Sequence, residues 1–74
     1  MKIGGGTMQL TLKAARVNKG YTQTEAAILL ETTKDVISNW ERGISFPDVR
    51  MLKKIEIVYG VTYQDLIFLQ PNNT

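Results

Sequence analysis

Hydrophobic residues recur at helical spacing on both sides of a short polar break near the middle of this 74-residue chain. Residues 23–43 read QTEAAILLETTKDVISNWERG, and the break is the polar segment 31–33. The two hydrophobic groups have the same spacing and are Ala26, Ala27 and Leu30 before the break and Val36, Ile37 and Trp40 after it. Because positions i, i+3 and i+4 share one face of a helix, the pattern predicts two short helices that cross sharply at a tight turn.

Both helices carry residues that favour a defined start. Thr22 and Glu25 form a capping-box pattern before the first helix, and Thr33 can accept a hydrogen bond from an early amide of the second. Gly43 is a typical stop after the second helix. Two capped starts and one stop support the two-helix interpretation.

The flanking segments predict three more helices. Residues 10–18 have a hydrophobic side, and residues 49–59 follow Asp48, an N-cap candidate, with hydrophobic residues at helical spacing. A short last helix is predicted at 63–69, after a second capping pattern that begins at Thr62. The hydrophobic runs fit helical and not strand spacing. The sequence therefore predicts an all-α fold, a compact bundle of five short helices.

The length of the chain is suited to one small domain, which we place at residues 10–70. Residues 1–9 contain three consecutive glycines and few hydrophobic anchors, so we expect a flexible N-terminal arm there. The tail 71–74 begins with proline and is expected to be disordered. We find neither a secretory signal pattern nor a hydrophobic segment of membrane length, and we expect a cytoplasmic protein.

The composition removes most catalytic chemistry. The chain has no Cys and no His, so it lacks the usual thiolate nucleophile, general base and metal ligands. Nor do paired carboxylates mark a recognisable catalytic pocket. We therefore expect no enzymatic activity, no metal site and no cofactor.

Charge is distributed unevenly, although the net charge of +2 is only mildly basic. Residues 1–20 carry four cations and no carboxylate, residues 21–43 carry two cations and four carboxylates, and the charges of residues 44–74 cancel. The central pair of helices is thus itself acidic. If this pair approaches a nucleic acid, attraction to phosphates must come from the helices around it.

Arg16 lies on the same side of the first predicted helix as Leu12 and Ala15. An unpaired charge is costly to bury, so a buried Arg16 needs an acidic partner. Alternatively, its aliphatic stem packs on the hydrophobic side while the guanidinium reaches water.

Residues 23–43 resemble the helix-turn-helix of the phage-repressor and Cro-like family, in which two helices and a tight turn form the motif. The residues that carry this resemblance are Gln23, Ala27, Ile37, Ser38, Trp40, Glu41 and Gly43. The resemblance extends from about residue 10 to residue 69, because the flanking segments fit the family's five-helix pattern. It implies a lambda-repressor-like bundle whose second and third helices form the helix-turn-helix.

The resemblance also implies roles for individual side chains. In this family the second helix of the motif lies in the DNA major groove. Positions at base edges correspond to Lys34, Asp35, Ser38 and Asn39, and positions at phosphates to Gln23, Thr33, Arg42 and Ser45. The family pattern further implies a structural ion pair between Arg16 and Glu41.

The four base-edge positions differ in chemistry. Lys34 can donate to guanine O6 and N7, Asn39 can bond adenine through two hydrogen bonds, and Ser38 can donate or accept. Asp35 can accept from cytosine N4, but a carboxylate in the first helical turn is equally well explained by the helix dipole. Lys34 can likewise be a solvated surface charge.

Three positions depart from the family pattern. Glu31 stands where the turn usually has Gly, and a left-handed conformation there costs a non-glycine residue about 1 kcal/mol or more. Thr32 replaces a usual hydrophobic residue and Ala26 a usual Leu. The replacements at Thr32 and Ala26 reduce the predicted hydrophobic contact between the two helices.

Two functions follow from the resemblance. The leading hypothesis is a small sequence-specific DNA-binding transcriptional regulator of Cro/repressor type, in a phage or prophage switch, that binds a double-stranded operator as a homodimer. The candidate dimer surface is formed by Ile67, Phe68 and Leu69, which can equally complete the core. The alternative is a phage antirepressor or modulator that binds a repressor protein through its helix-turn-helix surface, and the acidic motif with Asp35 favours it.

Overall fold

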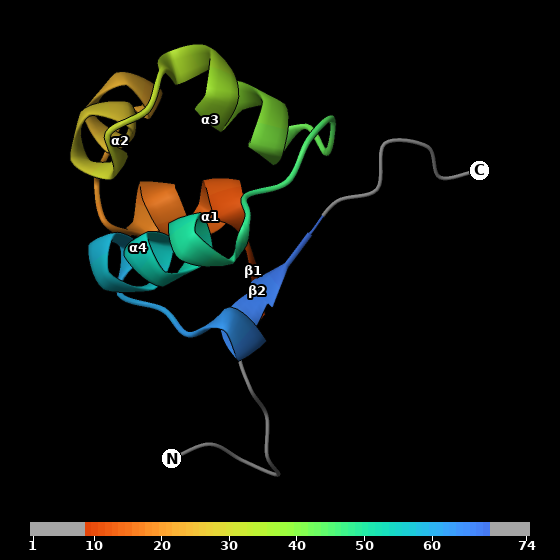
Figure 1. The fold of residues 1–74 in the computed structure, drawn as a ribbon. Helices are drawn as coiled ribbons and strands as arrows, with labels where there is room; N and C mark the ends of the chain where they lie inside the picture. The colour runs from red at the N-terminus through yellow and green to blue at the C-terminus, as the bar shows by residue number, and fades with distance from the viewer. Residues whose placement is uncertain (1–8, 69–74) are drawn as a thin grey trace, which may run out of the picture.

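The computed structural model describes residues 9–68, whose backbone forms four α-helices and two short strands. In chain order the elements are β1 (Leu10–Thr11), α1 (Leu12–Asn18), α2 (Gln23–Leu30), α3 (Lys34–Glu41), α4 (Val49–Tyr59), a 3₁₀ helix (Tyr63–Asp65) and β2 (Leu66–Ile67). In Figure 1, α2 and α3 form the upper part of the molecule, and α1 and α4 lie below them, above the strand pair. The predicted tail and, apart from Gln9, the predicted arm lie outside the described residues. None of the helices described here has the length and hydrophobicity that a membrane span needs.

The predicted starts of the three helices α2, α3 and α4 are confirmed. Thr22 Oγ1 accepts from the Glu25 amide at 3.0 Å, and the Thr22 amide donates to Glu25 Oε1 at 2.9 Å, which completes the capping box. Thr33 and Asp48 each accept from the amide three residues later, at 3.2 and 2.8 Å. These bonds satisfy amides that the first turn of a helix leaves without partners, and they fix where each helix begins.

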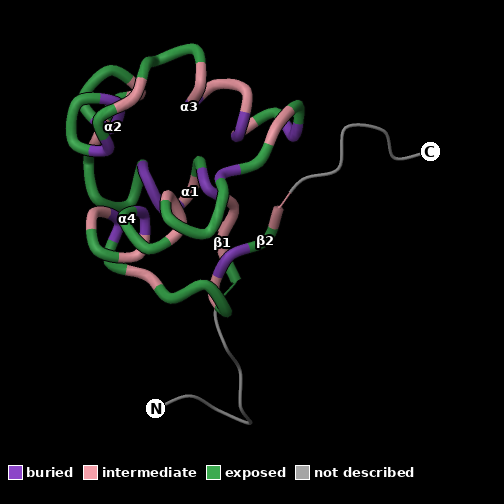
Figure 2. Tube along the Cα trace, in the orientation of Figure 1, coloured by how far each residue is buried: buried purple, intermediate pink, exposed green. Residues whose placement is uncertain are grey.

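One cluster of buried hydrophobic side chains holds the helices together. Its members are Leu12 and Ala15 of α1, Ala26, Ala27 and Leu30 of α2, Ile37 and Trp40 of α3, Ile55 and Tyr59 of α4, and Leu66 of β2. These positions appear as the purple segments of Figure 2, which occur on all four helices and on β2. The hydrophobic residues that predicted the two central helices are therefore core residues, with Val36 half-buried at the edge.

The prediction of a last helix at 63–69 is wrong. Tyr63–Asp65 forms a single 3₁₀ turn, and Leu66–Ile67 continues as a strand that runs parallel to β1. The paired residues are Leu10 with Leu66 and Thr11 with Ile67. The first predicted helix, at 10–18, is also two residues too long, because Leu10 and Thr11 form β1. The described fold thus has four α-helices instead of five and includes a strand pair.

Contacts between distant parts of the chain explain this difference. Thr11 ends β1 and caps α1, since its Oγ1 accepts from the Ala14 amide at 3.0 Å. At the other end, the amide of Thr62 donates to Asp65 Oδ2 at 3.1 Å, so the predicted capping pattern stabilises one turn. A seven-residue helix is marginal on its own. Strand pairing and the burial of Leu66 outweigh the local helical preference of this segment.

The turn between α2 and α3 keeps a left-handed residue without using glycine. Glu31 has φ 59° and ψ 45°, and among the described residues it is the one non-glycine with positive φ. Its amide donates to the carbonyl of Ile28 at 3.2 Å, and the Thr32 amide donates to that of Ala27 at 2.9 Å. The turn therefore closes α2 in the usual geometry, at a strain of about 1 kcal/mol relative to glycine.

Candidate nucleic-acid interface

One side of α3 points away from the core and is polar. Its opposite side carries Ile37 and Trp40, which are buried. At 100° per residue, the outward side holds Lys34, Asp35, Ser38 and Asn39, with Arg42 at the end of the helix. We call these five residues the α3 face. Lys34, Asp35 and Arg42 are exposed, whereas Ser38 and Asn39 are half-buried. The four base-edge candidates and one phosphate candidate therefore share one surface.

Two phosphate candidates flank this surface at helix N-termini. Gln23 is the first residue of α2, and Thr33 caps α3. The Thr33 hydroxyl oxygen accepts from the Val36 amide at 3.2 Å, which leaves its hydrogen free to donate. Ser45, the last candidate, lies in the loop after α3 and is half-buried, and its amide donates to the Asn39 carbonyl at 3.4 Å. These positions suit donors to an anion near either end of α3.

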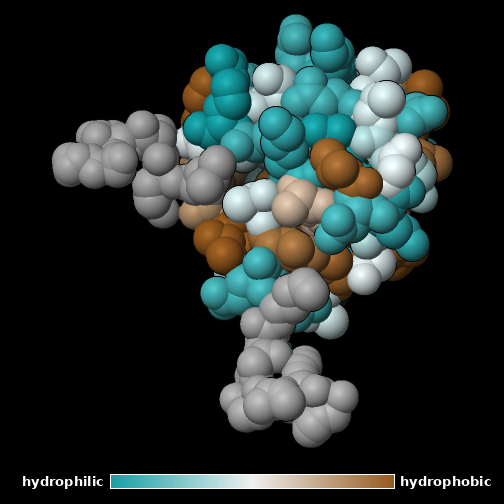
Figure 3. Space-filling view, turned by 180° about the vertical axis from the view of Figure 1, so that it is seen from behind, coloured by the Kyte–Doolittle hydropathy of each residue, from teal (hydrophilic) through white to brown (hydrophobic). Residues whose placement is uncertain are grey.

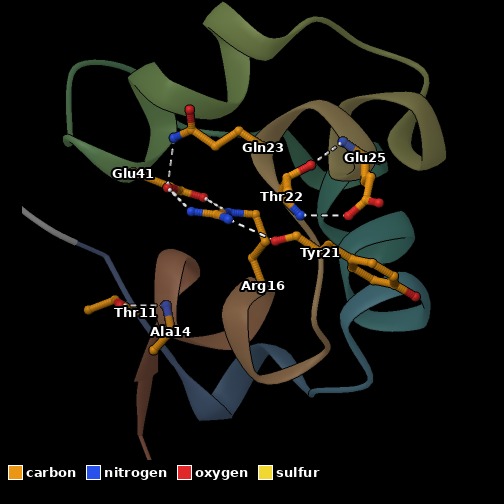
Figure 4. Close-up of polar contacts among 8 residues, drawn as sticks. All are labelled: Thr11, Ala14, Arg16, Tyr21, Thr22, Gln23, Glu25 and Glu41. Carbon is orange, nitrogen blue, oxygen red and sulfur yellow. Dashed lines mark hydrogen bonds and ion pairs between the residues drawn. The ribbon is translucent and has the colours of Figure 1, made fainter.

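Glu41 is the centre of a buried polar network that joins three helices (Figure 4). Arg16 Nε donates to Glu41 Oε2 at 2.7 Å, and Arg16 Nη2 donates to Glu41 Oε1 at 3.0 Å. Arg16 Nη1 also donates to the Tyr21 carbonyl at 2.8 Å. The side chains of Arg16 and Glu41 are only 8% and 5% exposed. The pairing implied by the resemblance is present, and the hydrogen bond to Glu41 raises the pKa of Arg16 above its ordinary value.

The same network orients Gln23. Its Nε2 donates to Glu41 Oε1 at 3.0 Å, and the reversed amide would place an oxygen against the carboxylate. The amide nitrogen has a second hydrogen, which this bond does not use. Glu41, itself held by Arg16, therefore keeps a free amide donor at the start of α2.

Ion pairs from outside the motif reduce its negative charge. Glu41 is paired with Arg16, and Glu31 Oε1 accepts from Lys54 Nζ of α4 at 2.8 Å. This hydrogen bond lowers the pKa of Glu31. Both cations lie outside residues 21–43, so a charge sum along the sequence overstates the negative charge of the motif. Lys54 was not singled out from the sequence, because nothing in a linear pattern indicates that it meets Glu31.

The α3 face itself carries an excess of one positive charge. Lys34 and Arg42 contribute two cations and Asp35 one carboxylate. The carboxylate of Glu41, the remaining charge of α3, is paired within the network of Figure 4. The motif of residues 21–43 carries the negative charge that the sequence indicates, with Glu25 and Glu31 also exposed, whereas the α3 face alone is weakly basic.

Asn39 and Arg42 form a contact that the sequence analysis did not identify. Arg42 Nη2 donates to Asn39 Oδ1 at 3.2 Å. The spacing of three residues on a helix could have indicated it, since such positions are neighbours.

A second, hydrophobic surface lies at the strand end of the molecule. Phe46, Tyr63 and Phe68 form an aromatic cluster, with ring centroids of Phe68 6.2 Å from Phe46 and 6.1 Å from Tyr63. Val49, 69% exposed, lines an adjacent groove. We call these four residues the aromatic face. In the rear view of Figure 3, hydrophobic residues gather in the lower half, around the strands, whereas the upper part is mostly hydrophilic.

The predicted dimer residues lie at this end. Ile67 is 39% exposed and Phe68 half-buried, while Leu69 lies outside the described residues. The groove beside Val49 has a volume of about 320 Å³ and is also lined by Leu52, Lys53, Glu56 and Tyr63.

The central aromatic residues belong to the core. Trp40 and Tyr59 are buried, which agrees with a packing role and not with base stacking. Burial, with a smaller contribution from the charge of Glu41, raises the pKa of Tyr59 to about 12. Over the described range we find no group of three or more acidic, His or Cys side chains that could hold a metal ion.

Comparison with known proteins places this architecture in a family. The helix-turn-helix family model matches residues 12–66. The HTH-type transcriptional regulator ImmR of Bacillus subtilis (strain 168) is 41% identical over 56 residues, which are 76% of this chain and 44% of that protein. The HTH-type transcriptional activator BcrR of Enterococcus faecalis is 34% identical over 56 residues, which are 76% of this chain and 28% of that protein. The chain spans less than half the length of these curated relatives. On this evidence, and with the motif that its sequence carries, the chain belongs to the phage-repressor and Cro type of the helix-turn-helix family.

Proposed function

We propose that this chain is a sequence-specific DNA-binding transcriptional regulator of Cro/repressor type. The observation that carries the proposal is the α3 face, which is polar, exposed and weakly basic, while the carboxylates of Glu31 and Glu41 are neutralised by Lys54 and Arg16. The names of the two relatives, a transcriptional regulator and a transcriptional activator, support the same class. The family resemblance favours a phage or prophage switch as the setting.

In this proposal α3 enters the major groove and its side chains meet base edges. Lys34, Ser38 and Asn39 provide hydrogen-bond donors, which suit the acceptors of guanine and adenine. Asp35 is exposed and can accept from cytosine N4. Each good pair of hydrogen bonds to one base is worth about 1–3 kcal/mol of discrimination.

Phosphate contacts hold the protein in register on the duplex. Gln23 and Thr33 each have a hydrogen that is not used in the hydrogen bonds among residues 9–68, and both lie at helix N-termini. Arg42 and Ser45 provide donors at the C-terminal end of α3. Because Glu41 fixes the Gln23 amide, the buried ion pair supports DNA binding as well as stability.

A homodimer over the strand end would extend the recognised site. Exposed hydrophobic area at this end comes from Phe46, Val49, Tyr63 and Ile67. Lys53 and Glu56 line the same groove, so a two-fold interface can bring Lys53 of one copy near Glu56 of the other. Two α3 helices reading half-sites about 34–36 Å apart then give useful specificity.

The alternative, a modulator that binds a repressor protein, is favoured by the acidic motif and Asp35. The excess positive charge of the α3 face does not favour that hypothesis. The modulator hypothesis predicts a different experimental result. The chain would form a stoichiometric complex with a repressor from the same genome and would not bind DNA.

The proposal is tested by selecting duplexes from a random pool with the full chain and measuring affinity at several salt concentrations. We expect a preferred sequence and an affinity that falls with salt. Each neutralised phosphate contributes about 0.9 to the slope of the logarithm of affinity against the logarithm of salt concentration. Lys34→Ala should weaken binding by about five- to tenfold, as for one charge-assisted contact. Lys19→Ala is the charge-matched control, because Lys19 lies beside Gly60 at the end of α4. No preferred sequence, even at low salt, would contradict the proposal.

A further inference from the structure

We infer that Arg42 is a specificity-determining residue that positions Asn39 for base reading. This inference rests on the proposed function. It goes beyond a phosphate contact, because it assigns to Arg42 an effect on which base is preferred and not only on how tightly DNA is held.

The geometry at the end of α3 holds Asn39 at two points. Its side-chain Oδ1 accepts from Arg42 Nη2 at 3.2 Å. Its backbone carbonyl accepts from the amides of Ile44, at 2.9 Å, and Ser45, at 3.4 Å. Asn39 is half-buried, whereas Arg42 is exposed. The residue therefore has a fixed backbone and a side chain with one fixed end.

The contact with Arg42 decides which end of the amide faces the groove. The last side-chain torsion of an asparagine is soft, and its two orientations have nearly the same shape. With Arg42 in place, the reversed orientation would set an amide N–H against a guanidinium N–H, so it is excluded. The Nδ2 group then points away from Arg42 as a donor, and Oδ1 keeps a second lone pair.

A fixed amide of this kind matches adenine. The N7 atom of adenine accepts from Nδ2, and its N6 amino group donates to the remaining lone pair of Oδ1. Without Arg42 the amide can turn over and offer its oxygen where adenine needs a donor. Loss of Arg42 should therefore relax the preference for adenine at this position.

Arg42 has further N–H groups that can reach a phosphate. Its charge and its orienting role must be separated by the experiment. Arg42→Lys keeps the charge but lacks the planar guanidinium, so it should retain most of the salt dependence and still lose orientation of Asn39. Arg42→Ala removes both.

The test measures binding of the full chain to four duplexes that differ only in the base read by Asn39, taken from the selected operator. Arg42→Lys and Arg42→Ala should reduce the discrimination between adenine and the other bases by about threefold or more, the value of one hydrogen bond. Asn39→Ala should abolish it. In the Asn39→Ala background, Arg42→Ala should lower affinity for all four duplexes equally.

Lys19→Ala is the control variant, because it removes one exposed charge beside Gly60 and leaves the Arg42–Asn39 contact intact. It should leave the base preference unchanged. If Arg42→Ala lowers affinity equally for the four duplexes and keeps the preference for adenine, Arg42 is a phosphate contact alone and the inference fails. If the unsubstituted chain prefers no sequence at all, the proposed function fails with it.

Discussion

The helix-turn-helix end and the strand end of this protein are stabilised by different kinds of contact. At the first end, α2 and α3 begin at side-chain caps from neighbouring residues, and one buried ion pair ties them to α1. At the second, β1 and β2 pair residues from opposite ends of the described chain, and the exposed surface is hydrophobic. Polar contacts set geometry at the end proposed to read DNA, whereas hydrophobic area dominates at the end proposed to dimerise.

The largest expected effect concerns the ion pair at the helix-turn-helix end. Arg16→Met leaves the Glu41 carboxylate buried without its partner, and such a loss costs about 3–5 kcal/mol of unfolding free energy. Urea unfolding measures it. Lys54→Met is the matched control, because it breaks a solvent-exposed pair with Glu31, which contributes little to stability. If the two substitutions lower the unfolding free energy equally, the buried ion pair contributes no more to stability than the exposed one.

At the strand end, the largest contribution should come from one buried side chain. Leu66→Ala removes a core residue of β2 and should lower the unfolding free energy by about 2–4 kcal/mol. Ile67→Ala, at the next and exposed position, should cost less than about 1 kcal/mol in the monomer. If Leu66→Ala is as mild as Ile67→Ala, β2 is not part of the core, and the strand end is only peripherally attached.

The same contrast explains what could be predicted from the sequence. The starts of α2, α3 and α4 followed from caps within three residues, and the orientation of α3 followed from the spacing of Ile37 and Trp40. The strand pair was missed, since nothing near Leu66 indicates that Leu10 lies beside it. Distant pairing of this kind depends on how the whole chain packs.

The candidate site shows the same division. The family resemblance grouped Lys34, Asp35, Ser38 and Asn39, and they share one side of α3 because they belong to one helix. The sum of charges over residues 21–43 does not show that Glu31 is paired, since Lys54 meets Glu31 only through the packing of α4 on α2. Local spacing thus predicts which side chains share a surface, and tertiary contacts decide the charge and orientation they present.

The smallest expected effect concerns the left-handed turn, where the helix-turn-helix end departs from the family pattern. Glu31→Gly relieves the positive φ but makes the unfolded chain more flexible and breaks the pair with Lys54. Because the last two terms offset most of the relieved strain, we expect the unfolding free energy to change by less than about 1 kcal/mol. Glu31→Ala loses the same ion pair while keeping the unfavourable φ, and it should be slightly less stable than the natural chain. The two variants share the loss of the ion pair and differ in backbone strain at the positive φ and in the freedom of the unfolded chain. A glycine variant no more stable than the alanine variant would therefore mean that the strain stored in this turn does not exceed the entropy that glycine adds to the unfolded chain.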